Sequence, residues 1–218
     1  MKMPITKLIV FSTVLLLGVA AWAQEFPRYE LAMNYDYMRF NPSTNVNSHS
    51  LNGGGGSITF NINDVVGIKA DLQGTGSNDT EFHIPASLNF PGGAFGTVQG
   101  NLFTYMIGPQ VKIRTPKFQP YGHVLLGGAH TNVYSSAFTT ICRPVVGSCG
   151  FSKAPTAEAF SLEPGIGFDI PISHMIQIRP AEFNYLMTRF SNPFTGANNQ
   201  HNFVYSAGIV FTFGHTQH

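Results

Sequence analysis

A period of two runs through most of this chain. Large apolar residues alternate with small or polar ones, which is the spacing at which the side chains of a β-strand share a face. The clearest case is the segment 29–40. One of its faces carries Tyr29, Leu31, Met33, Tyr35 and Tyr37, and the other carries Glu30, Ala32, Asn34 and Asp36. The pattern predicts an all-β chain. One face of its sheet carries large apolar side chains, and the other carries small or polar ones.

The polar face and the low charge content favour a sheet whose apolar face contacts lipid. A soluble sandwich would also alternate, so alternation alone leaves both folds open. Only 11% of the chain is charged, against roughly 25% in soluble proteins. Gly165 and Gly167 lie on the polar face of the segment 160–170. Glycine is a poor choice for a solvent-facing strand, whereas the inside of a narrow barrel needs that room for crossing side chains.

The connections between the alternating segments differ in length in a regular way. Short turns are expected near Asn63-Asp64, Thr115-Pro116-Lys117 and Pro171-Ile172-Ser173, and long polar connections at 41–52, 74–98, 131–156 and 191–201. Transmembrane barrels alternate short and long connections in this way, so we expect about eight strands. The expected strands are 28–40, 53–62, 65–73, 99–113, 118–131, 157–170, 175–189 and 200–213.

The seventh expected strand changes phase in its middle. Ile176 and Ile178 share one face, but Phe183 and Tyr185 share the other. A bulge at Pro180 would restore the register, because proline cannot donate a hydrogen bond to the ladder.

The first 23 residues have the form of a secretory signal peptide. Two lysines precede an apolar stretch that ends in Ala21-Trp22-Ala23. This predicts cleavage before Gln24 and a barrel domain that covers residues 24–218. The apolar stretch is short for a membrane-spanning helix.

The two cysteines and the net charge limit the kinds of metal site and partner that we expect for this chain. An exported chain meets an oxidising compartment, so Cys142 and Cys149 are expected to form a local disulfide. Two cysteines are too few for a structural zinc site. The formal net charge of +1 gives no basic field for nucleic acid. We expect neither a cofactor nor a nucleic-acid partner.

The end of the chain resembles a known family. Ser206, Gly208, Phe211 and Phe213 match the polar-x-Gly-x-x-aromatic-x-aromatic insertion signal of bacterial outer-membrane barrels, although five residues follow the last aromatic. The segments 106–110, 119–122 and 178–185 resemble the middle and late strands of small barrels related to the OmpA barrel and the OmpX group.

The resemblance implies a transmembrane up-and-down antiparallel barrel in the outer membrane of a diderm bacterium. Its surroundings would be outer-membrane lipid, and the barrel assembly machinery would insert it. The resemblance specifies architecture well and activity poorly, because the members of this family differ in role.

A barrel of this kind would enclose charged side chains. The candidate luminal network consists of Glu30, Asp36, Lys69, Asp71, Lys112, Glu163, Asp169, Arg179 and Glu182. Buried charges need partners, and an eight-stranded lumen is just filled by side chains. A rigid filling is therefore favoured over a narrow or gated pore. An open porin is excluded, because such channels need about 16 strands or more.

Three hypotheses for the function remain open. The favoured one is a non-enzymatic outer-membrane barrel that anchors four surface loops for envelope integrity, surface contact or adhesion, with an extracellular partner that the sequence does not identify. The second is a lipid-modifying enzyme that uses His123 or His130 together with Ser161 or Glu163. The third is a soluble periplasmic barrel that binds an apolar ligand, which predicts the reverse orientation, with Glu163 and Asp169 outside.

Overall fold

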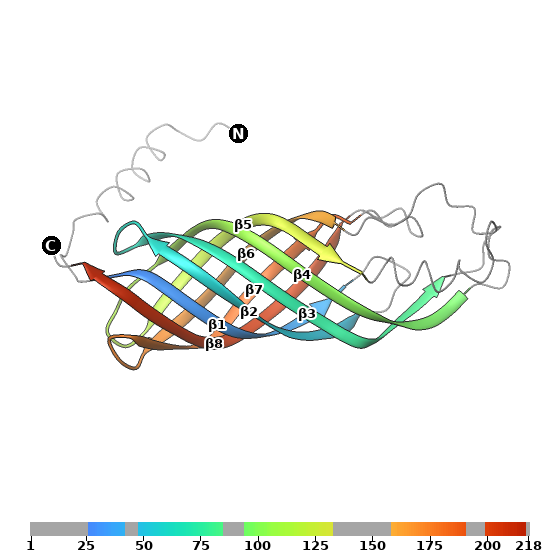
Figure 1. Ribbon diagram of the computed structural model, residues 1–218, viewed down its shortest axis with the longest axis horizontal. Helices are drawn as coiled ribbons and strands as arrows, with labels where there is room; N and C mark the ends of the chain where they lie inside the picture. Colours follow the sequence, from blue (N-terminus) through green and yellow to red (C-terminus); the bar gives the residue numbers. More distant parts are fainter. Residues whose placement is uncertain (1–25, 42–47, 85–93, 133–157, 191–198, 217–218) are drawn as a thin grey trace, which may run out of the picture.

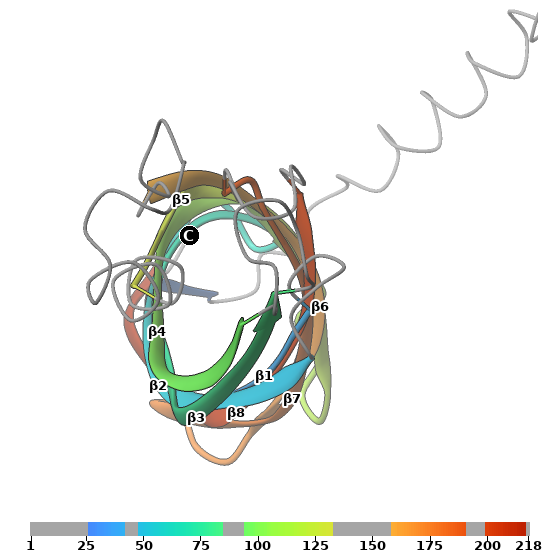
Figure 2. The ribbon, with the colours of Figure 1, turned by 90° about the vertical axis from the view of Figure 1, so that its right-hand side faces the viewer.

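Eight antiparallel strands close into a single barrel in the computed structural model (Figures 1 and 2). The structure describes residues 26–41, 48–84, 94–132, 158–190 and 199–216. The strands are β1 (Phe26–Phe40), β2 (His49–Asn61), β3 (Val66–Ile84), β4 (Ala94–Lys112), β5 (Gln119–Thr131), β6 (Glu158–Pro171), β7 (Ile176–Thr188) and β8 (Gln200–Thr216). Each strand pairs with its neighbour in sequence, and β8 returns to pair with β1. The predicted fold class is confirmed.

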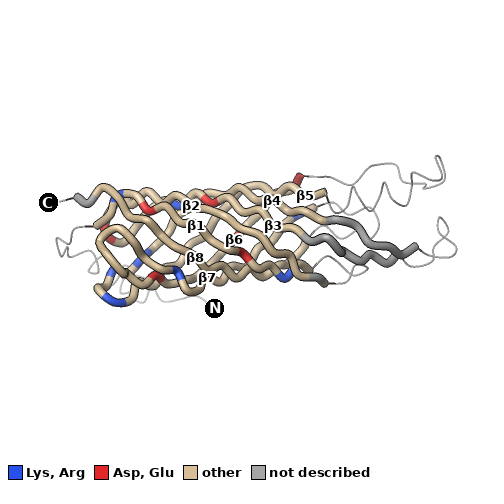
Figure 3. Tube along the Cα trace, turned by 60° about the horizontal axis from the view of Figure 1, so that its bottom comes forward, with Lys and Arg blue, Asp and Glu red and all other residues tan. Residues whose placement is uncertain are grey.

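The two faces of every strand are distributed as the alternation predicts. Large apolar side chains point outward, with Met33, Ile166 and Phe203 about 60% exposed (62%, 65% and 60%). Nine of the charged side chains are buried in the lumen, and Figure 3 shows charged positions spread along the barrel. Glu163 and Asp169 are fully buried. The reverse orientation, which a soluble ligand-binding barrel requires, is therefore wrong.

Short turns join the strands at one end of the barrel, where β1 begins and β8 ends (Figure 1). We call it the turn end, and the opposite end the loop end. In the β2–β3 turn, the side-chain oxygen of Asn63 accepts hydrogen bonds from the backbone of Val65 and Val66, at 2.9 and 2.6 Å. Ser173 does the same for Met175 and Ile176 in the β6–β7 turn. The three short turns are confirmed, the last beginning only after Pro171, the final residue of β6.

The long connection expected at 74–98 is wrong. β3 continues to Ile84 and β4 begins at Ala94, and their pairing runs to the register Ile84↔Ala94 (Figure 1). Above Gly76 and Leu102 the two strands have no further pairing with β2 and β5 within the described residues. Outside the lipid layer both faces of a hairpin contact water, so the apolar alternation that reveals a strand is lost. The composition of these residues is therefore typical of a loop.

The bulge expected at Pro180 is confirmed. The register of β7 with β8 shifts between Arg179 and Glu182. Because of this shift, Arg179 and Glu182 both point into the lumen although they are three residues apart. The extra residue thus brings a cation and a carboxylate of one strand to the same side of the wall.

The closing seam between β1 and β8 depends on a glycine. Gly208 faces Asn34 of β1, and a Cβ atom at this position would collide with the main-chain carbonyl oxygen of Met33. Gly74 on β3 is a contrasting case, since a Cβ there would find its nearest neighbour, a ring carbon of Phe103, at 3.7 Å.

We expect Gly208→Ala to destabilise the barrel by about 1–3 kcal/mol, the usual result of overpacking. Gly74→Ala should be neutral or slightly stabilising, because alanine loses less chain entropy than glycine in a strand. Urea unfolding in detergent micelles, followed by the shift in gel migration between unheated and heated samples, measures both. Equal stability of the two variants would contradict the close approach at the seam.

Candidate functional site

The lumen is the part of the barrel where chemistry-bearing side chains gather. Its half near the turn end is filled by ion pairs. Lys112 lies between two carboxylates, with its Nζ atom 2.8 Å from Glu30 Oε2 and 2.8 Å from Asp169 Oδ2. Arg114 binds the other oxygen of Glu30 at 2.7 Å. All four side chains are at least nine-tenths buried.

The ion pairs continue across the lumen without a break. Arg179 donates to Asp169 Oδ1 through Nε and to Glu182 Oε2 through Nη1, both at 2.9 Å. Lys69 binds Glu182 Oε1 at 2.9 Å and Asp71 at 3.3 Å. Because these residues come from β1, β3, β4, β6 and β7, the network ties most of the wall together across its centre.

Two inward-facing glycines of β6 make room for this network. Tyr121 of β5 reaches over Gly167 to donate a hydrogen bond to Glu182 of β7, and a Cβ at Gly167 would lie 2.5 Å from the Tyr121 hydroxyl. The Arg179 guanidinium carbon lies 4.7 Å from the centre of the Tyr121 ring. His123 and Asn184 meet over Gly165 in the same way. The glycines on the polar face thus serve crossing side chains.

The structure brings seven of the nine predicted network residues into ion pairs, together with Arg114, and leaves two outside. Asp36 and Glu163 are fully buried, and neither has a cationic nitrogen within 4 Å among the described residues. Gln73 donates to Glu163 Oε1 at 3.3 Å. Sequence spacing could not distinguish Asp36 and Glu163 from the other seven residues. It gives neither the position of a side chain along the barrel axis nor the distance that the side chain extends into the lumen.

The half of the lumen near the loop end holds an apolar cluster, which the sequence reasoning missed, alongside buried polar residues such as Thr188 and Gln200. The cluster consists of Met38, Phe40, Leu51, Leu102, Met106, Leu125, Ala129, Leu186, Phe190 and Val204. Most are less than 2% exposed. A signal was present in the sequence, because Met38 and Phe40 continue the inward series of Glu30 and Asp36. The lumen therefore has an ionic layer near the turn end and an apolar layer near the loop end.

The candidate catalytic residues do not come together. His123 points into the lumen, whereas His130 points outward. Ser161 is luminal, but its register partner on β5 is Gly127, four residues beyond His123. Across the residues that the structure describes, no group of three or more His, Cys, Asp or Glu side chains is arranged to hold a metal ion.

Some expected features lie partly or wholly outside the described residues. These are the signal peptide at 1–23 and the disulfide between Cys142 and Cys149.

The insertion-signal residues lie on β8, where Ser206 is luminal and Phe213 is 42% exposed. β8 continues to Thr216, which pairs with Phe26, so the strand is longer than predicted. None of the described residues forms a helix long and apolar enough to span a membrane.

An apolar outer wall around a polar, charged lumen defines a transmembrane β-barrel. The particular family follows from a family model: the outer membrane protein beta-barrel domain matches residues 9–213. The chain belongs to this family, and it is an outer-membrane β-barrel protein. In this family the short turns face the periplasm and the long connections face the outside of the cell.

Solved structures share the fold at low sequence identity. Neisserial surface protein A is 13% identical with a TM-score of 0.57, and the match covers 85% of this chain and 97% of that protein. OprG from Pseudomonas aeruginosa is 12% identical with a TM-score of 0.54, and the match covers 88% and 98%. No curated protein sequence matches the chain.

Removing the central cation of the ionic layer should be costly. Lys112→Met would leave Glu30 and Asp169 with one cationic partner fewer in a buried position. Breaking a buried pair in this way typically destabilises by about 3–5 kcal/mol. The control is Lys117→Met in the exposed β4–β5 turn, which should change stability by no more than about 0.5 kcal/mol. Urea unfolding in detergent compares the two, and a Lys112 variant as stable as the control would show that the ionic layer does not hold the barrel together.

Proposed function

We propose that this protein is a non-enzymatic outer-membrane anchor with a closed lumen, which presents its long connections at the cell surface. The observation that carries the proposal is the two-layer filling of the lumen. Hydrated ions would have to displace the ion pairs around Lys112 and Lys69 and then pass an apolar cluster that includes Leu125 and Leu186.

The absence of an assembled catalytic group among the described residues supports the non-enzymatic part of the proposal. A nucleophile and its base need to lie within hydrogen-bond reach. His123 packs instead against Tyr121, with ring centres 6.2 Å apart, and lies beside Asn184 rather than Ser161. Among the described residues, neither ring nitrogen of His123 has a hydrogen-bond partner, so no nucleophile or acid is positioned against it.

The route to the membrane is part of the same proposal. The leader at 1–23 would be removed after export, and the assembly machinery would read Ser206, Gly208, Phe211 and Phe213 of the last strand. The four long connections would then contact an extracellular partner, a role in surface contact, adhesion or envelope integrity.

Conductance tests the closed lumen. We expect no steady single-channel current from the protein reconstituted in a planar bilayer, because both layers exclude hydrated ions. Heat-modifiable migration of the same sample verifies that the barrel is folded. Regular current steps that scale with protein concentration would overturn the closed lumen and favour a pore.

Epitope display tests the orientation. A peptide epitope inserted after Gly147, within the β5–β6 connection, should bind antibody on intact cells. The same epitope inserted between Asn63 and Asp64 in the β2–β3 turn should bind only after the outer membrane is permeabilised. The opposite result would place the long connections in the periplasm.

A further inference from the structure

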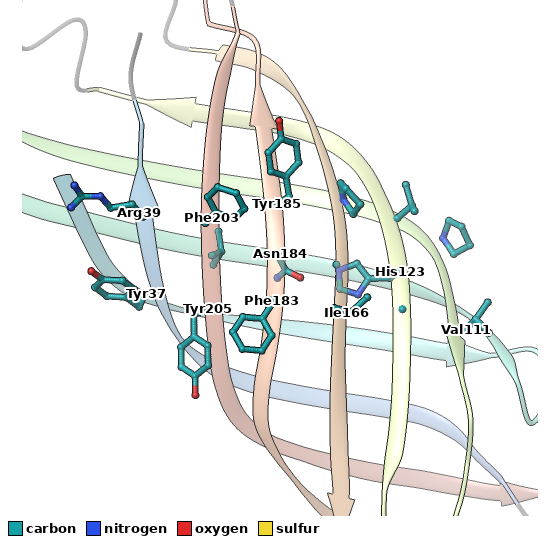
Figure 4. Close-up of a pocket in the computed structure, with 16 residues that line it drawn as sticks. Tyr37, Arg39, Val111, His123, Ile166, Phe183, Asn184, Tyr185, Phe203 and Tyr205 are labelled. Carbon is teal, nitrogen blue, oxygen red and sulfur yellow. The ribbon is translucent and has the colours of Figure 1, made fainter. Parts of the chain in front are cut away.

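The outer wall of the barrel carries an elongated hollow of about 820 Å³, which we call the wall groove. Figure 4 shows it on the lipid-facing side, running from β1 and β8 across β7 and β6 toward β4. Tyr185 and Phe203 lie toward its upper part, and Val111 and Ile166 toward its lower part in this view. Most of its lining side chains face the membrane, and the buried residues His123 and Asn184 also line it.

One side of the wall groove is a fixed set of aromatic rings. Phe183 packs against Tyr205 with ring centres 5.5 Å apart, and Tyr185 packs edge-on against Phe203 at 5.6 Å. The hydroxyl of Tyr205 donates a hydrogen bond to the carbonyl of Pro180 at 2.8 Å. Because the rings hold one another, this side is formed before any ligand arrives, which lowers the entropy cost of binding.

The floor of the wall groove is low because its residues are small or compact. Gly122 of β5 faces outward, and a Cβ there would meet its nearest atoms only at 3.7 and 3.8 Å. Pro109 and Pro164 lie on the two neighbouring strands. Ile166 of β6 lies between Gly122 and Phe183 and forms the middle of the floor. The shape suits a linear apolar chain lying along the wall.

A single cation stands at the rim of the wall groove. Arg39, the last residue but one of β1, points outward at the loop end. Its Nη1 atom makes a long hydrogen bond of 3.5 Å to Ser50, and no acidic side chain among the described residues pairs with it. The guanidinium group thus keeps free donors at the loop end of the wall groove. A guanidinium with free donors suits phosphate.

We propose that the wall groove binds one phosphorylated, multiply acylated glycolipid of the outer leaflet. An acyl chain lies in the groove against the Phe183–Tyr205 and Tyr185–Phe203 pairs, and Arg39 donates to a phosphate of the head group. The glycolipid is favoured over a phospholipid of the inner leaflet because Arg39, the only arginine or lysine among the groove's described lining residues, lies at the loop end. The inference uses the orientation proposed above, which the epitope experiment tests separately.

The test fills the groove and, separately, removes the cation. Gly122→Leu places a side chain on the open floor, and Gly74→Leu on β3 is its control, an outward strand glycine with similar room and no place in the groove. Arg39→Gln removes the rim charge. Its control is Arg28→Gln, an outward arginine of the same strand at the turn end.

Native mass spectrometry of each purified barrel, titrated with lipid A or with phosphatidylglycerol, measures the bound lipid. We expect one lipid A molecule on the unaltered protein and on both control variants. Gly122→Leu and Arg39→Gln should each weaken it about tenfold, the effect expected when one well-placed contact is lost. Heat-modifiable migration shows that every variant is folded.

Three results would overturn the proposal. The first is equal retention of lipid A by all folded variants, which indicates ordinary boundary lipid. The second is binding of phosphatidylglycerol as tightly as lipid A, which indicates a groove for any acyl chain. The third is loss of lipid A with Arg28→Gln as much as with Arg39→Gln, which indicates non-specific charge attraction.

Discussion

Closure of the backbone ladder between β1 and β8 is the constraint on which the rest of this barrel depends. In hydrocarbon there is no water to satisfy backbone N–H and C=O groups, so a sheet that crosses the membrane must have no free edge. Once the ladder closes, each strand has one face to lipid and one to the lumen. Gly208 allows β8 to lie close enough to β1 for this closure.

A closed eight-stranded wall leaves a lumen that side chains must fill, and this protein fills it in two ways. Near the turn end, charges from opposite walls are paired and hydrogen-bonded, which offsets part of the cost of removing them from water. Near the loop end, an apolar cluster fills much of the lumen, together with buried polar side chains. The ionic layer fixes the strands relative to one another, and the apolar layer excludes water above it. The same filling that makes the wall rigid also closes the lumen to ions.

The outer wall adds a second level of organisation. Boundary lipid contacts any apolar surface, but the bulge at Pro180, the small floor residue Gly122 and the aromatic pairs of β7 and β8 shape this part of the wall. A shaped surface with one cation at its rim can prefer a particular lipid. The barrel is then a ligand-binding surface on its outside while its inside is structural.

Structural features that depend on neighbouring residues could be predicted from the sequence. Features that depend on where the strands lie in space could not. The alternation in 29–40, the short turn at Asn63 and the phase break at Pro180 each follow from neighbouring residues, and each is found in the structure. The extension of β3 to Ile84 was missed because residues 74–80 are glycines and small polar residues, a composition typical of a loop.

The sequence by itself determined the fold class, the number of strands and which side chains point inward, because all three follow from a period of two and from connection lengths. Only the tertiary structure decided which inward residues meet. Lys112 pairs with Asp169 across 57 residues of chain, while Asp36 stays without a cation, because strand tilt and register set the height of each side chain in the lumen. The wall groove likewise exists only when six strands come together in the closed wall, since no segment of the chain contains it.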